Sequence, residues 1–155
     1  MHNLKSNKMK NLLLAVTVML FGYSASAQNT KTILDNYLSV KNALVNSDSK
    51  TASEAVEILY KNIKSENDFS KKEDLLKAVD KLNKAGNLEK QRAAFSEVSD
   101  IMWKLVETSD QINQPVYYQY CPMKKAYWLS TEKEIKNPYY GASMLTCGKV
   151  SETKK

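Results

Sequence analysis

Apolar positions between residues 30 and 108 recur at intervals of three and four, which is the spacing that places side chains on one face of an α-helix. The first stripe consists of Ile33, Tyr37, Val40 and Leu44. A polar run at residues 46–49 follows it, and it interrupts the apolar repeat. The pattern therefore predicts a first helix that ends before this polar run.

Three further apolar stripes of the same kind follow along the chain. They comprise Ala52, Ala55, Val56, Leu59 and Ile63; Leu75, Leu76, Val79 and Leu82; and Ala94, Val98, Ile101 and Leu105. The last stripe lies within residues 88–107, which contain neither glycine nor proline. The spacing predicts three more helices, joined by short polar links.

Residues typical of helix ends lie near the predicted boundaries. Thr51 with Glu54, and Ser70 with Glu73, have the spacing of a capping box, which favours helix starts at these positions. Gly86 follows the third stripe, where a left-handed residue commonly ends a helix. Four helices with short links predict an all-α fold, an up-down-up-down four-helix bundle, within one domain at residues 28–155.

The composition changes after Gln114. All three prolines and both cysteines of the 155-residue chain lie between Pro115 and Cys147. Residues 116–120 have the composition of a short strand, and residues 137–141 have that of a turn. We therefore expect residues 115–150 to form a loop or short-hairpin module that packs on the bundle.

The N-terminus has the three parts of an export signal. Three lysines within the first ten residues precede an apolar run at residues 12–21, and Ala25-Ser26-Ala27 then supplies small residues for signal peptidase. The apolar run is about half the ~20 residues that a membrane-spanning helix needs, so we expect no stable membrane anchor. The prediction is a signal peptide at residues 1–27, starting at Met1 or Met9, cleavage near Ala27/Gln28, and a periplasmic location.

Removal of this leader changes the charge and the available chemistry. The whole chain has 23 basic and 17 acidic residues, and the leader carries three of the lysines and no acid, so the net charge falls from +6 to +3. The only histidine, His2, is lost as well, which excludes histidine-based catalysis and histidine metal ligands. The lysines that remain are spread among acids, so we expect neither an enzyme nor a nucleic-acid-binding protein.

Sulfur is concentrated in two short segments, Cys121-Pro122-Met123 and Met144-Leu145-Thr146-Cys147. Thiolate and thioether are soft ligands, which favour Cu(I) or Ag(I) over the hard ions that carboxylates bind. The candidate metal ligands are Cys121, Met123, Met144 and Cys147. The aromatic side chains expected to surround them are Tyr118, Tyr120, Trp128 and Tyr139.

A disulfide is the alternative interpretation of the same cysteines. Two cysteines in an exported protein commonly form one, and a Cys121–Cys147 bridge would stabilise the fold by roughly 3 to 4 kcal/mol in the chain-entropy model. The methionines would then fill gaps beside the bridge. The sequence leaves both alternatives open, and the two are compatible because a dithiol site can be oxidised when it holds no metal.

The C-terminal motifs also resemble those of a bacterial family of domains of unknown function. The resemblance rests on the segments around Cys-Pro-Met, Tyr127-Trp128, Asn137-Pro138-Tyr139-Tyr140-Gly141 and Met144-x-x-Cys147-Gly148, together with residues 33–38 and 91–96 in the helical part. Such domains occur as small exported proteins and are also fused to periplasmic adaptor subunits of copper and silver efflux systems. The resemblance implies a periplasmic accessory protein that binds Cu(I) or Ag(I) at the four sulfur residues, with an efflux adaptor as its partner. The alternative function is a disulfide-stapled module that binds another envelope protein without metal.

Overall fold

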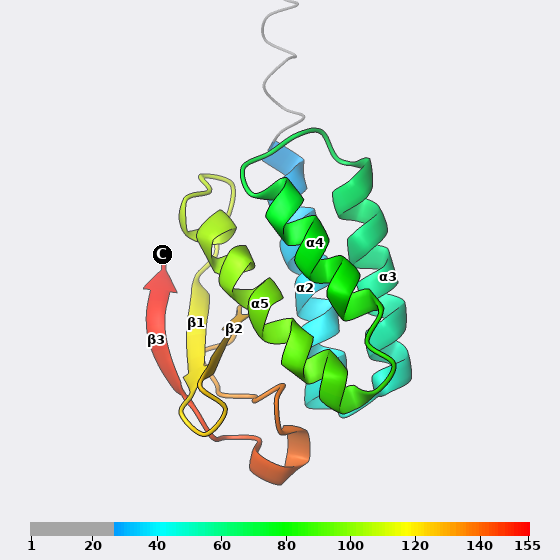
Figure 1. Ribbon diagram of the computed structural model, residues 1–155. Helices are drawn as coiled ribbons and strands as arrows, with labels where there is room; N and C mark the ends of the chain where they lie inside the picture. The colour runs from blue at the N-terminus through cyan, green and yellow to red at the C-terminus, as the bar shows by residue number, and fades with distance from the viewer. Residues whose placement is uncertain (1–26) are drawn as a thin grey trace, which may run out of the picture.

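The computed structural model describes residues 27–155, in which four helices precede a small sheet (Figure 1). The helices are α2 (Ala27–Val45), α3 (Ser49–Ser65), α4 (Lys72–Asn83) and α5 (Leu88–Glu107). The predicted signal peptide, residues 1–27, lies outside the described residues except for Ala27, and it stays a prediction. No helix in residues 27–155 combines the length and apolar character needed to cross a bilayer.

The four helices match the four apolar stripes, and most stripe residues are buried, although Ala55, Leu76 and Ile101 are only half-buried. Residues beside the stripes, such as Phe95 and Met102 on α5, are buried as well. On α3, for example, the buried positions are Ala52, Val56, Leu59 and Ile63. The burial of these stripes supplies the main stabilising contribution of the helical part, because each fully buried aliphatic side chain contributes about 1.5–3 kcal/mol. Periodicity therefore identified the helices and the faces that they bury.

The predicted helix ends are wrong at three places. Asp48, and not Thr51, is the N-cap of α3: its carboxylate accepts hydrogen bonds from the Thr51 amide at 2.9 Å and the Thr51 hydroxyl at 2.6 Å. Lys71, in the left-handed region at φ 68°, precedes α4 in place of the predicted Ser70 cap. The described glycines with positive φ do not include Gly86, and α4 ends at Asn83 with Lys84 in right-handed conformation.

The prediction of an all-α fold is also wrong, because the C-terminal part forms a three-stranded antiparallel sheet and the fold is mixed α and β. Its strands are β1 (Val116–Cys121), β2 (Ala126–Ser130) and β3 (Lys149–Lys154), in the order β2-β1-β3. The expected hairpin is present as β1–β2, and its turn closes with a 2.8 Å hydrogen bond from the Lys125 amide to the Cys121 carbonyl. Strand β3, which pairs with β1 from far along the chain, was not predicted from the sequence.

Register decides which side chains of the sheet share a face. Gln119 pairs with Trp128 and Cys121 with Ala126, so these four lie on one face. The intervening pairs, Tyr118 with Leu129 and Tyr120 with Tyr127, lie on the other. The register between β1 and β3 shifts between Tyr118 and Gln119, which marks a bulge beside the C-terminal half of β1.

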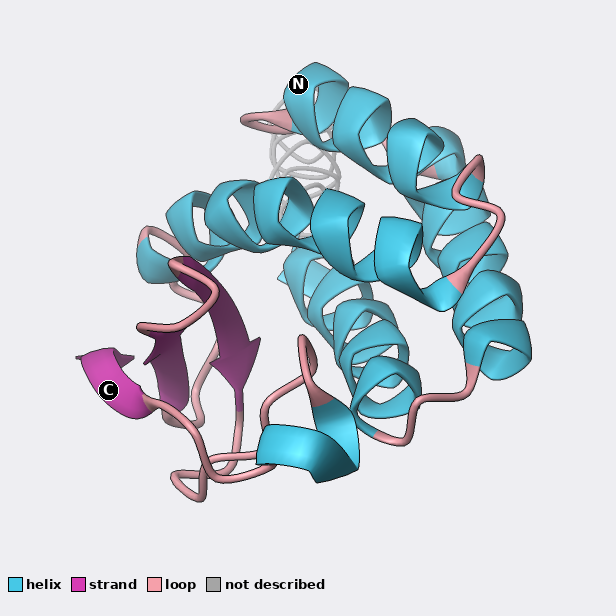
Figure 2. Ribbon diagram, turned by 60° about the horizontal axis from the view of Figure 1, so that its bottom comes forward, coloured by secondary structure: helices cyan, strands magenta, loops and turns pink. Residues whose placement is uncertain are grey.

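The sheet packs against the helices mainly through α5. The indole of Trp103 on α5 stacks on the ring of Tyr118 with centroids 4.7 Å apart, and the Tyr118 hydroxyl donates a 2.8 Å hydrogen bond to Asp100. Figure 2 shows the strands grouped on one side of the helices. The face of the sheet that carries Tyr118, Tyr120 and Tyr127 is therefore the one that contacts α5.

Tyrosine side chains cover the free edge of β2. The backbone N–H of Leu129 donates to the Tyr37 hydroxyl at 3.0 Å, and this hydroxyl also forms a 2.7 Å hydrogen bond with Ser99. The Tyr139 hydroxyl donates to the carbonyl of Tyr127. Unpaired strand edges invite association with other strands, and these side chains satisfy two edge groups instead. They also fix β2 to the helices, which gives the sheet a defined position.

Candidate soft-metal site

The fold brings the two cysteines together although 26 positions separate them in the sequence. Cys121 ends β1, and Cys147 lies two residues before β3. Tyr120 pairs with Lys149, so continuing the antiparallel register places Gly148 opposite Cys121 and Cys147 one position past the end of β1. Both cysteines are free thiols, and they lie close enough for Cys121 to contribute to the raised pKa of the Cys147 thiol. The β1–β3 pairing is thus what assembles the dithiol.

The two thiols differ in their surroundings. Cys121 is 0% exposed, whereas Cys147 is half-buried. Desolvation raises the pKa of the Cys147 thiol above its ordinary value, and the hydrogen bond and charge interaction with Cys121 raise it further. Cys147 is therefore a protonated thiol at neutral pH, and binding a metal ion there must release its proton.

Asn137 fixes the segment that carries Cys147. This side chain is 0% exposed; its amide donates a 2.8 Å hydrogen bond to the Cys147 carbonyl, and its oxygen accepts one of 2.8 Å from the Tyr139 amide. The Asn137 backbone N–H also donates to the Leu145 carbonyl at 2.8 Å. One buried residue thereby ties the turn at residues 137–141 to the cysteine loop.

Gly148 allows this loop to lie close to the sheet. Its φ is 154°, and a Cβ at this position would lie 2.8 Å from Cη2 of Trp128 and 2.9 Å from the Tyr120 carbonyl oxygen. A side chain here would be strained and would also collide with backbone that cannot move aside. Glycine at this position therefore permits the approach that places Cys147 next to Cys121.

Arg92 fastens the same loop region to the helices. From α5, its Nε donates to the Pro138 carbonyl at 2.8 Å, and its Nη2 donates to the Leu44 carbonyl and the Ser47 hydroxyl, both at 2.9 Å. One guanidinium thus joins the C-terminal end of α2 to the turn that contains Asn137. Arg92 therefore connects α5, the end of α2 and the turn that holds the cysteine loop.

The candidate methionines lie at the same end of the sheet as the cysteines. Met123 is in the β1–β2 turn and is 65% exposed. Met144 ends the short 3-10 helix η1 (Gly141–Met144) and is half-buried, and its carbonyl accepts a 3.1 Å hydrogen bond from the Cys147 amide. The structure thus brings the two cysteines to one end of the sheet, where the turn with Met123 and the helix η1 with Met144 also lie.

The four candidate aromatic residues divide between two places. Tyr118 and Tyr120 lie on the face of β1 opposite Cys121, where both contact Tyr127 with ring centroids 4.5 and 4.6 Å apart. Trp128 lies on the face that Cys121 shares and meets Tyr139 edge to face at 6.1 Å. Burial raises the pKa of Tyr139, and Cys121 is among the smaller contributors, so the Tyr139 hydroxyl lies within electrostatic range of the buried thiol. Trp128 and Tyr139 are therefore the pair beside the cysteines.

Sequence analysis missed the residues that position the cysteines. It identified residues 137–141 as a turn, and the structure has a turn there that leads into η1. It did not predict that the Asn137 amide holds Cys147 or that Gly148 lies against Trp128. In the sequence, Asn137-Pro138 and Cys147-Gly148 can each be explained by local structure alone. Only the tertiary contacts of Asn137 and Gly148 show that they also position the cysteines.

The donor set suits a soft monovalent ion better than zinc. Residues 27–155 contain no cluster of three or more histidine, cysteine, aspartate or glutamate side chains that could hold a metal. Structural zinc sites take four nitrogen or sulfur ligands from such residues, whereas Cu(I) and Ag(I) accept few ligands and favour thiolate and thioether. The residues present, two thiols with a methionine close to each in the sequence, therefore suit Cu(I) or Ag(I) better than zinc.

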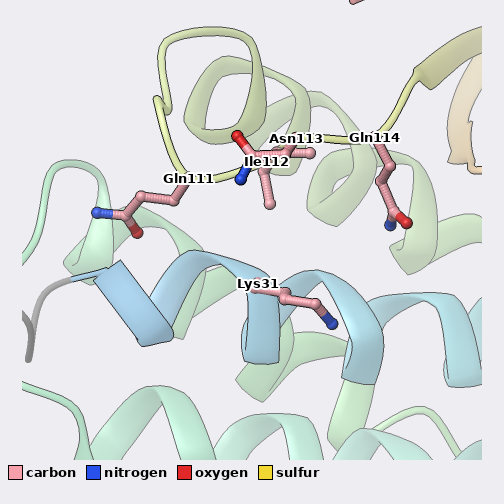
Figure 3. Close-up of a pocket in the computed structure, with 5 residues that line it drawn as sticks. All are labelled: Lys31, Gln111, Ile112, Asn113 and Gln114. Atoms are coloured by element: carbon pink, nitrogen blue, oxygen red, sulfur yellow. The ribbon is translucent and has the colours of Figure 1, made fainter.

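A shallow cavity of about 200 Å³ lies elsewhere, between α2 and the loop before β1 (Figure 3). It is lined by Lys31 and by Gln111, Ile112, Asn113 and Gln114. The Lys31 ammonium is already paired with Asp35 at 2.7 Å. Figure 1 places this loop at the end of the sheet opposite the β1–β2 turn, so the cavity is separate from the dithiol.

Fold and site together define a small α/β domain with a paired-cysteine module at its C-terminal end. Residues 33–114 match the family described as "Protein of unknown function (DUF3347)", and the chain belongs to this family. The match covers most of α2 and all of α3, α4 and α5 and ends before β1, so the four candidate sulfur ligands lie beyond it. No curated protein and no solved structure matches the chain.

Proposed function

We propose that this protein binds one soft monovalent metal ion, Cu(I) or Ag(I), through the sulfurs of Cys121 and Cys147. The observation that carries the proposal is the proximity of two free thiols, which the β1–β3 pairing brings to the same end of the sheet. Met123 and Met144 would add thioether donors that favour soft ions and exchange readily.

The surroundings of the pair support a metal site. Trp128 and Asn137 are fully buried, Tyr139 is buried beside Trp128, and the Asn137 amide donates a hydrogen bond to the Cys147 carbonyl, so the groups around the thiols are shielded from solvent. Such a surround orients the ligands and limits access of water and oxidants. The loop geometry is fixed by Asn137 and Arg92 without any metal, so little conformational entropy would be lost on binding.

A periplasmic location and a role in metal efflux or tolerance belong to the same proposal. The leader-like residues 1–27 and the resemblance to domains fused with efflux adaptors support them. In this setting the protein would sequester Cu(I) or pass it to or from an adaptor. The match to a family of unknown function adds no activity to this argument.

An anaerobic Cu(I) titration of the reduced protein against a competing chelator tests the proposal. We expect one Cu(I) per chain and loss of binding in the double variant Cys121→Ser/Cys147→Ser. Met102→Leu is the matched control, because this buried core methionine on α5 removes a sulfur away from the site. Absence of binding, or binding that survives loss of both cysteines, would contradict the proposal.

The same thiol contact supports a second function, a disulfide-stapled module that binds another envelope protein. Two neighbouring thiols in an exported protein can also be oxidised to a bridge. Mass spectrometry of the protein purified from the periplasm distinguishes the two, because a disulfide lowers the mass by two hydrogens. A fully oxidised pair that never loads metal would favour the second function, and a reduced pair that loads one Cu(I) would favour the first.

A further inference from the structure

We infer that the two cysteines have different tasks in metal exchange: Cys147 is the ligand at which the metal ion enters and leaves, and Cys121 is the ligand that retains it. The inference rests on the proposed metal binding and adds an order of ligand exchange to it. The difference in exposure carries it, because Cys121 is 0% exposed while Cys147 is half-buried.

The sheet accounts for the burial of Cys121. The residue is the last of β1, and its cross-strand partner Ala126 is 4% exposed. On the same face lies the fully buried Trp128, whose ring meets the buried Tyr139 ring edge to face at 6.1 Å. A molecule as large as a metal donor therefore has no direct approach to the Cys121 sulfur in this conformation.

Cys147 lies instead in a loop with exposed soft or apolar neighbours. Leu145, two residues earlier, is 38% exposed, and Met123 in the adjacent turn is 65% exposed. Met123 and Leu145 are two of the three large hydrophobic side chains that are exposed in residues 27–155. A soft donor arriving at this end of the sheet would thus meet a thioether and a half-buried thiol before the buried thiol.

The exchange can be written with its bonds balanced. The Cys147 sulfur forms a bond to the ion while one donor–metal bond breaks, and the Cys147 proton goes to the leaving donor thiolate. Cys121 then forms the second bond, gives up its proton to solvent, and displaces the last donor ligand. Release to an acceptor thiolate follows the same steps in reverse: the Cys121–metal bond breaks first as the acceptor binds, and the ion then leaves from Cys147, which takes back its proton. No electron is transferred, because the ion stays monovalent throughout.

Thiol alkylation of the reduced, metal-free protein tests the difference in access. Iodoacetamide is added to the native protein, and peptide mass spectrometry follows both cysteines with time. We expect Cys147 to react at least about tenfold faster, because a fully buried thiol reacts only through local opening. In denaturant the two rates should become similar, which is the control for intrinsic reactivity. Equal native rates, or faster reaction at Cys121, would overturn the inference.

Cu(I) transfer from a coloured chelator complex tests the order of ligand exchange. We expect Cys147→Ser to slow capture, whereas Cys121→Ser captures at close to the wild-type rate and releases the ion faster to a second chelator. Circular dichroism of each variant verifies that it folds. If Cys121→Ser slows capture as much as Cys147→Ser does, the inference is wrong. A wild-type protein that captures no Cu(I), yet shows the expected alkylation order, would instead contradict the proposed function on which the inference rests.

Discussion

Asn137→Ala is the substitution that most directly tests how the fold builds the dithiol. It removes the amide that donates 2.8 Å to the Cys147 carbonyl and the oxygen that accepts 2.8 Å from the Tyr139 amide. Asn137 is 0% exposed, so water cannot replace these partners without a local rearrangement. Both the stability and the position of Cys147 should therefore depend on this side chain.

The expected cost follows from the two partners left unsatisfied. A buried polar group without a partner costs about 1–3 kcal/mol, so the loss for Asn137→Ala should be roughly 2–5 kcal/mol. The free energy of unfolding from urea titration of the reduced protein measures it. Because the loop also loosens, we expect faster alkylation of Cys121 in the variant, since this thiol is protected by the same packing.

Asn113→Ala is the matched control, because Asn113 is an exposed residue in the loop before β1. It should change the free energy of unfolding by less than about 0.5 kcal/mol, as exposed substitutions usually do. If Asn137→Ala unfolds at the same urea concentration as Asn113→Ala, with both thiols as protected as before, then Asn137 does not hold the cysteine loop and the reasoning is refuted.

Four further predictions follow from single features of the structure. Gly148→Ala should destabilise the fold and speed alkylation of the buried thiol, because a Cβ there would lie 2.8 Å from Trp128; unchanged stability by urea titration would contradict this. Tyr37→Phe should cost about 1–3 kcal/mol, because it leaves the buried Leu129 N–H without its acceptor, whereas Tyr60→Phe, on the half-buried part of α3, should cost less. Burial raises the pKa of Tyr37 well above its ordinary value, so the folded state holds this proton more tightly than the unfolded state. Stability should therefore be intact below about pH 10 and fall above it by about 1.4 kcal/mol per pH unit, and a flat profile in wild type would contradict this. The raised pKa of Cys147 means that Cu(I) binding releases its proton, so affinity should rise at least about tenfold per pH unit near neutrality; titrations at three pH values with equal affinity would be inconsistent with thiolate ligation.

The spacing of apolar residues was sufficient to locate the helices, because each helix buries one stripe of apolar side chains. The α5 prediction, residues 88–107, has the same bounds as the observed helix. The errors at helix ends arose where several capping residues compete: Asp48 and Thr51 both suit an N-cap, and the Asp48 carboxylate takes that role by binding the Thr51 amide. Sequence alone does not decide between two good candidates three residues apart.

The sheet was harder to predict for a different physical reason. The residues of β3, Lys149–Lys154, are mostly exposed and polar, so they lack the alternation that marks a half-buried strand. Their strand conformation comes from pairing with β1, a contact between distant segments. The same pairing brings Cys147 near Cys121. The sequence therefore identified the candidate sulfur residues but could not show that the two cysteines lie close together.

The central claim is that both cysteines ligate one soft metal ion. X-ray absorption at the copper edge of the Cu(I)-loaded protein measures the ligand atoms directly. We predict a first shell of sulfur alone, with one copper per chain, and loss of that signal in Cys121→Ser/Cys147→Ser while Met102→Leu keeps it. A first shell dominated by nitrogen or oxygen, or an unchanged sulfur shell in the double variant, would contradict the account.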